Sequence, residues 1–333
     1  MKRVMIFSSL FMLATGLFSQ QSQFPKLVGP YFGQKPLGMM PELFAPGIIS
    51  TRSHEIWISV SPDGREIYYT LRTGPLGKGC NVILCMQQNK NSRKGPFVAA
   101  FSGKYSDKEQ CMYENGNKIV FNSKRPKSGQ GEPEVLEDIW ITERINDKWT
   151  EPKSLTDIDL GKRRMSPCIT SSGNLYFSGN YENPENQPDI YISKFINGKY
   201  SMPEKLGDGV NSEYYEGHVF VSPDESFIIF DSIRPVGFGK TDMYISCKLE
   251  DGTFSKAVNL GEKINSASHD SAPFVTFNGK FLFFFSDRSD VKDYSEKPLS
   301  YSEILNSMNQ PKNGNGDIYW VDAKIIKELR LKK

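Results

Sequence analysis

The chain has 333 residues, with 41 Lys or Arg and 39 Asp or Glu, so its formal net charge is +2. This balance provides no basic surface for nucleic acid, and the length is enough to bury a core without disulfides. Aromatic residues make up 12% of the chain, which suits the half-buried faces of β-strands.

The N-terminus is predicted to be an export signal and not part of the fold. Lys2 and Arg3 precede an apolar stretch, 4–18, which is too short for a good membrane span. We expect residues 1–20 to be a signal peptide and 21–40 a linker, so that the mature protein is periplasmic or secreted. An uncleaved anchor is the alternative. No later segment approaches a spanning length.

A hairpin pattern recurs five times along the chain. In its first copy, the turn Ser61-Pro62-Asp63-Gly64 separates alternating apolar residues from a second strand at 66–70. The equivalent turn positions are 64, 116, 173, 225 and 279, which are 52, 57, 52 and 54 residues apart. A repeat of this length is typical of propeller blades.

Two further strands follow each hairpin. The third strand begins with Asp in four copies, at Asp138, Asp189, Asp242 and Asp317, and has a degenerate copy at 80–84. A fourth strand is predicted at 96–99, 152–155, 203–206 and 257–260. The last repeat lacks one, but residues 41–44 match it.

The displaced copy predicts how the fold closes. A strand from the N-terminus that completes the last sheet removes two exposed edges at once. We therefore predict an all-β fold, a single β-propeller of five four-stranded blades over residues 41–323, closed by the N-terminal strand. Six blades are the alternative. Two short helices are expected, one near 301–308 within an insertion in the last blade and one in the C-terminal segment 324–333.

The repeat resembles a known family. The motif Ser-Pro-Asp-Gly before an aromatic-rich strand, at 61–69 and, with Glu in place of Gly, at 222–230, together with Asp-Ile-Tyr, resembles the TolB-like, WD40-like Pro-Asp (PD40) repeats. The resemblance covers about 41–322 and implies an exported bacterial propeller, in a family whose function is uncharacterised. The chain lacks the N-terminal α/β domain of TolB itself and has five repeats where six are usual.

Candidate site residues lie where each first strand begins, because these strands line the channel of a propeller. Counting back from each turn predicts that one equivalent position is occupied by Glu55, Asp107, Glu216 and Asp270, and in the third blade by Arg164 beside Arg163. The three histidines of the chain lie in the same segments: His54, His218 and His269.

These residues allow two interpretations. A ring of carboxylates and imidazoles at the channel mouth could bind a sugar, a cationic peptide end or a divalent metal, and no other cofactor is expected. A repeated acid can instead be structural, accepting backbone N–H bonds or pairing with Arg. The third-strand aspartates are predicted to be such acceptors, with Arg72, Arg125, Arg234 and Arg288 as their partners.

The five cysteines are predicted to be small buried apolar residues. Cys111 and Cys168 occupy equivalent positions in neighbouring first strands. Such strands usually lie farther apart than the roughly 7 Å between Cα atoms that a disulfide tolerates.

Two functions remain open. The first is a binding or scaffold module that presents a polar channel mouth to a protein or glycan partner. The second is a hydrolase or lyase that acts on carbohydrate through channel-mouth carboxylates. The sequence contains no nucleophile elbow and no phosphate loop, which favours the first. A monomer without a nucleic-acid partner is expected.

Overall fold

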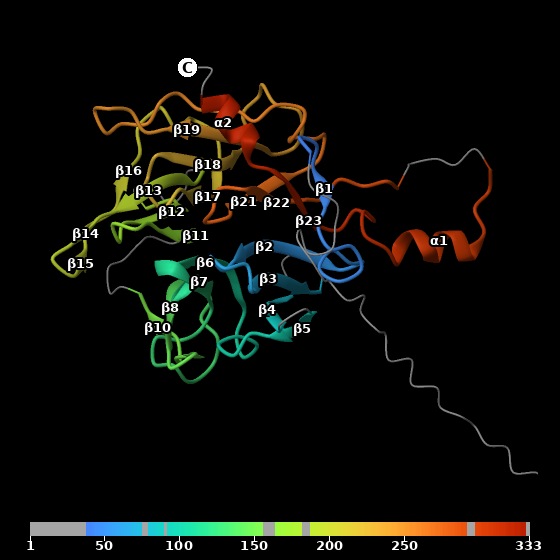
Figure 1. Cartoon of the computed structure of the whole chain (residues 1–333), viewed down its shortest axis with the longest axis horizontal. Helices are drawn as coiled ribbons and strands as arrows, with labels where there is room; N and C mark the ends of the chain where they lie inside the picture. The colour runs from blue at the N-terminus through green and yellow to red at the C-terminus, as the bar shows by residue number, and fades with distance from the viewer. Residues whose placement is uncertain are drawn as a thin grey trace, which may run out of the picture.

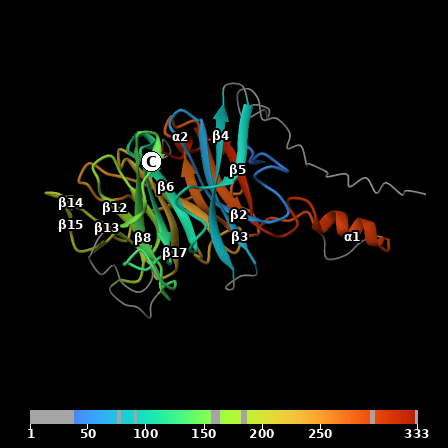
Figure 2. The same ribbon diagram turned by 90° about the horizontal axis from the view of Figure 1, so that it is seen from below.

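The computed structural model describes residues 38–74, 79–89, 92–155, 164–181, 187–291 and 297–330. The predicted signal peptide and most of the predicted linker lie outside these residues. The described chain forms five antiparallel sheets arranged around a ring (Figure 1), and Figure 2 shows the same ring from below. The protein is a five-bladed β-propeller, as the hairpin spacing predicts.

Each blade runs from an inner strand to an outer one, in chain order. Blade one contains β2 (His54–Val60), β3 (Glu66–Thr73), β4 (Cys80–Asn89) and β5 (Ser92–Val98). Blade two contains β6 (Asp107–Tyr113), β7 (Lys118–Ser123), β8 (Asp138–Ile145) and β10 (Lys153–Ser154), with β9 (Lys148–Trp149) also on β8. Blade three contains β11 (Arg164–Ile169), β12 (Leu175–Gly179), β13 (Asp189–Ser193) and β16 (Glu204–Lys205).

Blade four follows the same order, and blade five departs from it only in its outer strand, which comes from the N-terminal segment. Blade four contains β17 (Glu216–Val221), β18 (Phe227–Ser232), β19 (Asp242–Cys247) and β20 (Val258–Asn259). Blade five contains β21 (Asp270–Val275), β22 (Phe281–Ser286), β23 (Asp317–Asp322) and, as its outer strand, β1 (Glu42–Leu43). A small separate hairpin joins β14 (Phe195–Ile196) to β15 (Lys199–Tyr200).

The N-terminal strand closes the ring, as predicted. β1 pairs antiparallel with β23, placing Glu42 opposite Trp320. The Phe44 N–H donates to the Ile318 carbonyl at 2.8 Å, and the Phe44 ring packs edge-on against Phe283. Phe44 is fully buried, so the closing segment is part of the core.

A short latch joins each of three neighbouring blade pairs. In each latch, one Asn or Ser side chain forms two hydrogen bonds with a single residue in the third strand of the preceding blade. It accepts a hydrogen bond from the backbone N–H of that residue and donates one to its backbone C=O. The pairs are Asn211 with Ile190, Asn265 with Met243 and Ser50 with Ile318. The next residue, Ser212, Ser266 or Thr51, donates to the acid that begins the following blade. The Asn-Ser turn of the repeat therefore connects two blades.

Every inner strand contains a β-bulge, at the third residue or next to it. The pairing register of all five first hairpins shifts there. In four blades a residue at the bulge has positive φ: Trp57 (47°), Glu109 (58°), Ser166 (50°) and Ala272 (52°). A bulge re-aims side chains and breaks the alternation of the two faces. It therefore decides which residues face the channel.

Two α-helices of the described chain lie outside the sheets. The helix α1 (Tyr301–Met308) begins with a capping box from Ser300 and Glu303 and buries none of its residues; it projects away from the ring (Figure 1). The helix α2 (Lys324–Arg330) buries Ile325 and Ile326 in the core. Both match the helices predicted from the sequence. In the part of the chain that the structure describes, no helix has the length and apolar character to cross a membrane.

Candidate functional site

The four predicted channel-mouth acids are buried within the blades. Glu55, Asp107, Glu216 and Asp270 are at most 1% exposed. Each accepts hydrogen bonds from the turn before it; in blade four, for example, Ser212 donates its N–H at 3.0 Å and its hydroxyl at 2.5 Å to Glu216. These contacts are the ones that the structural interpretation predicts.

Three of these acids also pair with arginine. Arg125 lies 3.7 Å from Asp107, Arg234 3.0 Å from Glu216 and Arg288 2.5 Å from Asp270. The prediction that these arginines serve the third-strand aspartates is therefore wrong. In each of these blades a serine of the second strand lies opposite the acid, for example Ser123 opposite Asp107. The arginine comes two residues after this serine. This short spacing places the guanidinium group next to the acid of the first strand and not next to the aspartate of the third strand.

Glu55 is the exception among the acids. Blade one has Leu71 opposite Glu55 and Thr73 where blades two, four and five have arginine. Burial raises the pKa of Glu55 to about 7, although hydrogen bonds from Thr51 oppose this shift. Glu55 is thus a buried carboxyl group that changes its charge near neutral pH.

Of the two basic residues predicted in blade three, the structure describes Arg164, which pairs with blade two. Arg164 forms an ion pair with Asp138 at 3.0 Å and donates to the Glu137 carbonyl at 3.1 Å. It therefore joins blade three to the third strand of blade two. Arg163 lies outside the described residues.

The three histidines share one pocket, which we call the histidine pocket. Its volume is about 480 Å³, and inner strands of all five blades contribute to it. Its lining residues are His54, Ile56, Trp57, Arg72, Lys108, Glu109, Met165, Tyr215, His218, Asp231, Ile233, Thr241, His269, Ser271, Phe285 and Asp287. The pocket lies where the inner strands begin, which is the end at which the sequence predicts these histidines.

Two of the histidines pair with aspartates. The His218 Nδ1 atom lies 3.1 Å from Asp231, and the His269 Nδ1 atom lies 2.8 Å from Asp287. Burial of His218 lowers its pKa, but the Asp231 carboxylate outweighs this effect, so the pKa of His218 lies above 6.5. Imidazoles held this way have a fixed orientation and direct Nε2 away from the carboxylate.

His54 behaves differently from the other two. Burial and the nearby Arg72 charge lower the pKa of His54 to about 4. Its Nδ1 atom accepts from the Gly316 N–H at 3.2 Å, so the neutral ring carries its proton on Nε2. His54 is therefore an uncharged hydrogen-bond donor, and its ring lies 5.3 Å from that of Phe285.

A charged group from blade two occupies another side of the pocket. Lys108 lies 3.1 Å from Glu109 and 2.9 Å from Glu137. Burial lowers its pKa, but the two carboxylates raise it to about 12. The Lys108 ammonium lies 5.5 Å from the centre of the Trp57 ring, which in turn packs 5.4 Å from His218.

The pocket provides hydrogen-bond donors, acceptors and aromatic faces. Among the residues that the structure describes, no three His, Cys, Asp or Glu side chains are arranged to hold a metal ion. The divalent metal considered for the channel mouth therefore has no ligand set among these residues. Chemically, the arrangement can bind a polar ligand, and its two His–Asp pairs can exchange protons with it.

Apart from the three histidines, the pocket residues were not predicted from the sequence, and five of them bear on its chemistry: Trp57, Lys108, Glu109, Asp231 and Asp287. The first three lie at or beside the bulges. Asp231 and Asp287 were detectable, because they depart from the repeat: Asp231 stands where blade two has Asn122 and blade five has Phe285. Side chains that break a repeat are candidates for function, whereas repeated ones serve the architecture.

No family model and no curated protein matches the sequence. Solved propeller structures do match its fold. A prolyl endopeptidase is 12% identical with a TM-score of 0.35; the match covers 71% of this chain and 32% of that protein, so the chain spans about a third of its length. An α-L-arabinofuranosidase from Lactobacillus brevis is 14% identical (TM-score 0.41; 81% and 92% covered). Another from Podospora anserina is 11% identical (TM-score 0.42; 89% and 94% covered). At this similarity the comparisons assign the chain to no family.

Proposed function

We propose that the chain is a binding propeller whose histidine pocket takes a neutral carbohydrate ring or short glycan. The observation that carries this proposal is the composition of the pocket, which combines aromatic and imidazole rings with paired charges. Ligand sites are typically concave and aromatic-lined, with a few polar groups that fix orientation. Sugar rings match such a surface with their C–H faces and their hydroxyl groups.

The charge balance of the pocket supports a neutral ligand. The carboxylates of Glu109, Asp231 and Asp287 each lie within 3.1 Å of Lys108, His218 or His269. Arg72 also lines the pocket, so its permanent cations are Arg72 and Lys108, against three carboxylates. A phosphate or a strongly cationic peptide would therefore meet charges of both signs and no single matching field. Hydroxyl groups can use the Nε2 donors and the remaining carboxylate lone pairs.

We further propose that the protein is an exported TolB-like, PD40-type propeller. The Ser-Pro-Asp turns and the basic, apolar N-terminal stretch support this assignment. In this proposal the ligand is an extracellular or periplasmic glycan, alone or on a glycoprotein partner. A hydrolase or lyase would have to use the His–Asp pairs of the pocket, since the buried first-strand acids cannot touch a substrate.

The test is an array of neutral oligosaccharides, followed by calorimetry with the strongest hit. We expect His269→Ala and Asp287→Asn to weaken binding at least tenfold, because both side chains are partly exposed in the pocket. Asp290→Asn is the matched control, since Asp290 is 77% exposed and does not line the pocket. Absence of binding to every glycan, or equal binding by all three variants, refutes the proposal. Release of shorter sugars would reassign the pocket to catalysis.

A further inference from the structure

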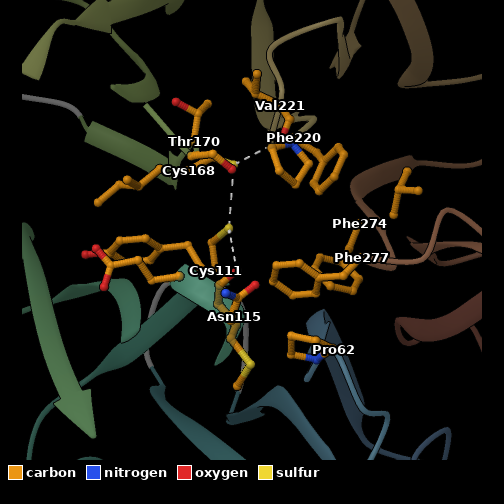
Figure 3. A pocket seen from close by; sticks show the side chains of 16 residues that line it. Pro62, Cys111, Asn115, Cys168, Thr170, Phe220, Val221, Phe274 and Phe277 are labelled. Carbon is orange, nitrogen blue, oxygen red and sulfur yellow. Dashed lines mark hydrogen bonds between the residues drawn. The ribbon is translucent and has the colours of Figure 1, made fainter. Parts of the chain in front are cut away.

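The opposite end of the channel contains a second pocket, which holds two cysteines. Its volume is about 450 Å³, and it lies where the inner strands end. Figure 3 shows Cys111 and Cys168 on one side of it and Phe220, Phe274 and Phe277 on the other. Both cysteines line the pocket; Cys111 is partly exposed and Cys168 is buried.

The two sulfur atoms are in contact. Their separation is 3.5 Å, and the Cys111 thiol donates to the Cys168 sulfur. The Cys168 thiol in turn faces the Val221 carbonyl at 3.7 Å. Both cysteines resume the strand pairing directly after the bulge of their blade, so they occupy equivalent positions in neighbouring inner strands. The two side chains therefore span the space between neighbouring inner strands, and their sulfur atoms touch.

No other two cysteines are in contact. Cys80, Cys85 and Cys247 are free, as are the two cysteines of the pair, and all five cysteines belong to the described residues. Burial raises the pKa of Cys85 to about 12 and also raises that of Cys80. These thiols are therefore poor nucleophiles and serve as internal references for the pair.

We propose that Cys111 and Cys168 are a peroxide-sensitive dithiol that oxidises to a disulfide joining blades two and three. A disulfide needs sulfur atoms about 2.05 Å apart, so closure requires the two sulfurs to approach by about 1.5 Å from their present contact. The oxidant is hydrogen peroxide or another small hydroperoxide, which the pocket can admit.

The reaction proceeds in two balanced steps. The Cys168 thiolate attacks one oxygen of hydrogen peroxide; the O–O bond breaks, and hydroxide leaves and takes up a proton to form water. The product is a sulfenic acid at Cys168. The Cys111 sulfur then loses its proton, attacks the Cys168 sulfur and displaces the hydroxyl group as a second water. Two thiols are oxidised, and one peroxide is reduced to two waters.

The hydrogen bond between the thiols assigns the two roles. Donation from Cys111 lowers the pKa of Cys168 against the effect of burial. The same contact, together with burial, raises the pKa of Cys111. Cys168 therefore attacks the peroxide, and Cys111 resolves the sulfenic acid.

The test is to treat the reduced protein with one equivalent of hydrogen peroxide and count thiols after denaturation. We expect the five cysteines to retain about three titratable thiols, and peptide mapping to find Cys111 joined to Cys168. A dithiol reductant restores all five thiols. An unchanged thiol count, or a cross-link through Cys80, Cys85 or Cys247, overturns the proposal. This measurement uses the wild-type chain and needs no variant to fold.

Variants then separate the two roles. In Cys111→Ser, which keeps a hydroxyl donor, dimedone should trap a sulfenic acid at Cys168. Trapping at Cys111 in Cys168→Ser should be at least tenfold slower; equal rates refute the assigned roles. Cys247→Ser is the matched control, since it removes a buried thiol outside the pair, and it must leave the cross-link intact.

Discussion

Glu225 is the only one of the five blade-turn residues that is not glycine. Its φ is 58°, close to the 64° to 87° of Gly64, Gly116, Gly173 and Gly279. A side chain at positive φ is unfavourable, so its presence calls for a compensating interaction. Its carboxylate accepts hydrogen bonds from four blade-three side chains and from Lys248: Thr170 (2.9 Å), Ser172 (2.5 Å), Asn174 (2.9 Å), Tyr176 (3.1 Å) and Lys248 (2.9 Å).

We predict that Glu225→Gln destabilises the propeller by about 2–3 kcal/mol at pH 7. Burial alone raises the pKa of Glu225, but the hydrogen bonds from Lys248, Ser172 and Thr170 lower it from an ordinary 4.5 to about 2. At about 1.4 kcal/mol for each pKa unit, this shift corresponds to about 3.5 kcal/mol in favour of the charged form, and solvent screening reduces it to about 2–3 kcal/mol. The amide of Gln also directs an N–H₂ group at donors.

The pH dependence of this prediction follows from the direction of the shift. Because the folded pKa is depressed, the stabilisation is complete above about pH 4.5 and is lost as the pH falls toward 2. The difference between wild type and Glu225→Gln is therefore constant from pH 7 to pH 5 and shrinks below that.

Urea unfolding at pH 7, 5 and 3 measures this difference. Glu250→Gln is the matched control, since Glu250 is exposed and lies two residues beyond Lys248. A difference below about 0.5 kcal/mol at pH 7, or one that does not change between pH 7 and pH 3, would refute the reasoning.

Three further predictions concern the blade junctions. Arg288→Met should cost about 3–5 kcal/mol, because it leaves the Asp270 carboxylate buried without its partner; urea unfolding measures this cost, and adding Asp270→Asn should recover part of it. Ser50→Ala should cost about 1–2 kcal/mol, because it removes both hydrogen bonds to Ile318, which calorimetry detects as a lower Tm. Glu55→Gln should gain stability relative to wild type as the pH rises from about 4.5 to 7, with no further change above that. The folded pKa of Glu55, about 7, exceeds the ordinary 4.5, so folding of the wild type is penalised as the unfolded chain ionises over this range; equal pH profiles of Tm would contradict this.

The architecture was predictable because its signals are local. Turn residues, alternating strands and the aspartates of the third strands act over a few neighbours, so their recurrence gave five blades. The displaced copy at 41–44 predicted the closure, because a missing outer strand must be supplied from elsewhere.

The site was less predictable because it depends on the bulges. Regular alternation places consecutive residues on opposite faces, yet Ile56 and Trp57 both line the histidine pocket, as do Lys108 and Glu109. The four bulge residues with positive φ are Trp57, Glu109, Ser166 and Ala272. None of them is glycine, so the sequence shows no sign of the positive φ at these positions. The sequence placed the histidines at the correct end of the channel. The side chains of the neighbouring acids, however, point into the blades and are buried there.

The closing strand β1 has a consequence for assembly. It is separated from its partner strand by almost the whole chain, since Ser50 and Ile318 are 268 residues apart. Closing so long a loop is a late and entropically costly step. Until that step, β23 presents an open edge that β1 of a second molecule can occupy equally well. Refolding from concentrated denatured protein will therefore compete with strand exchange, and dilution will favour the closed monomeric ring.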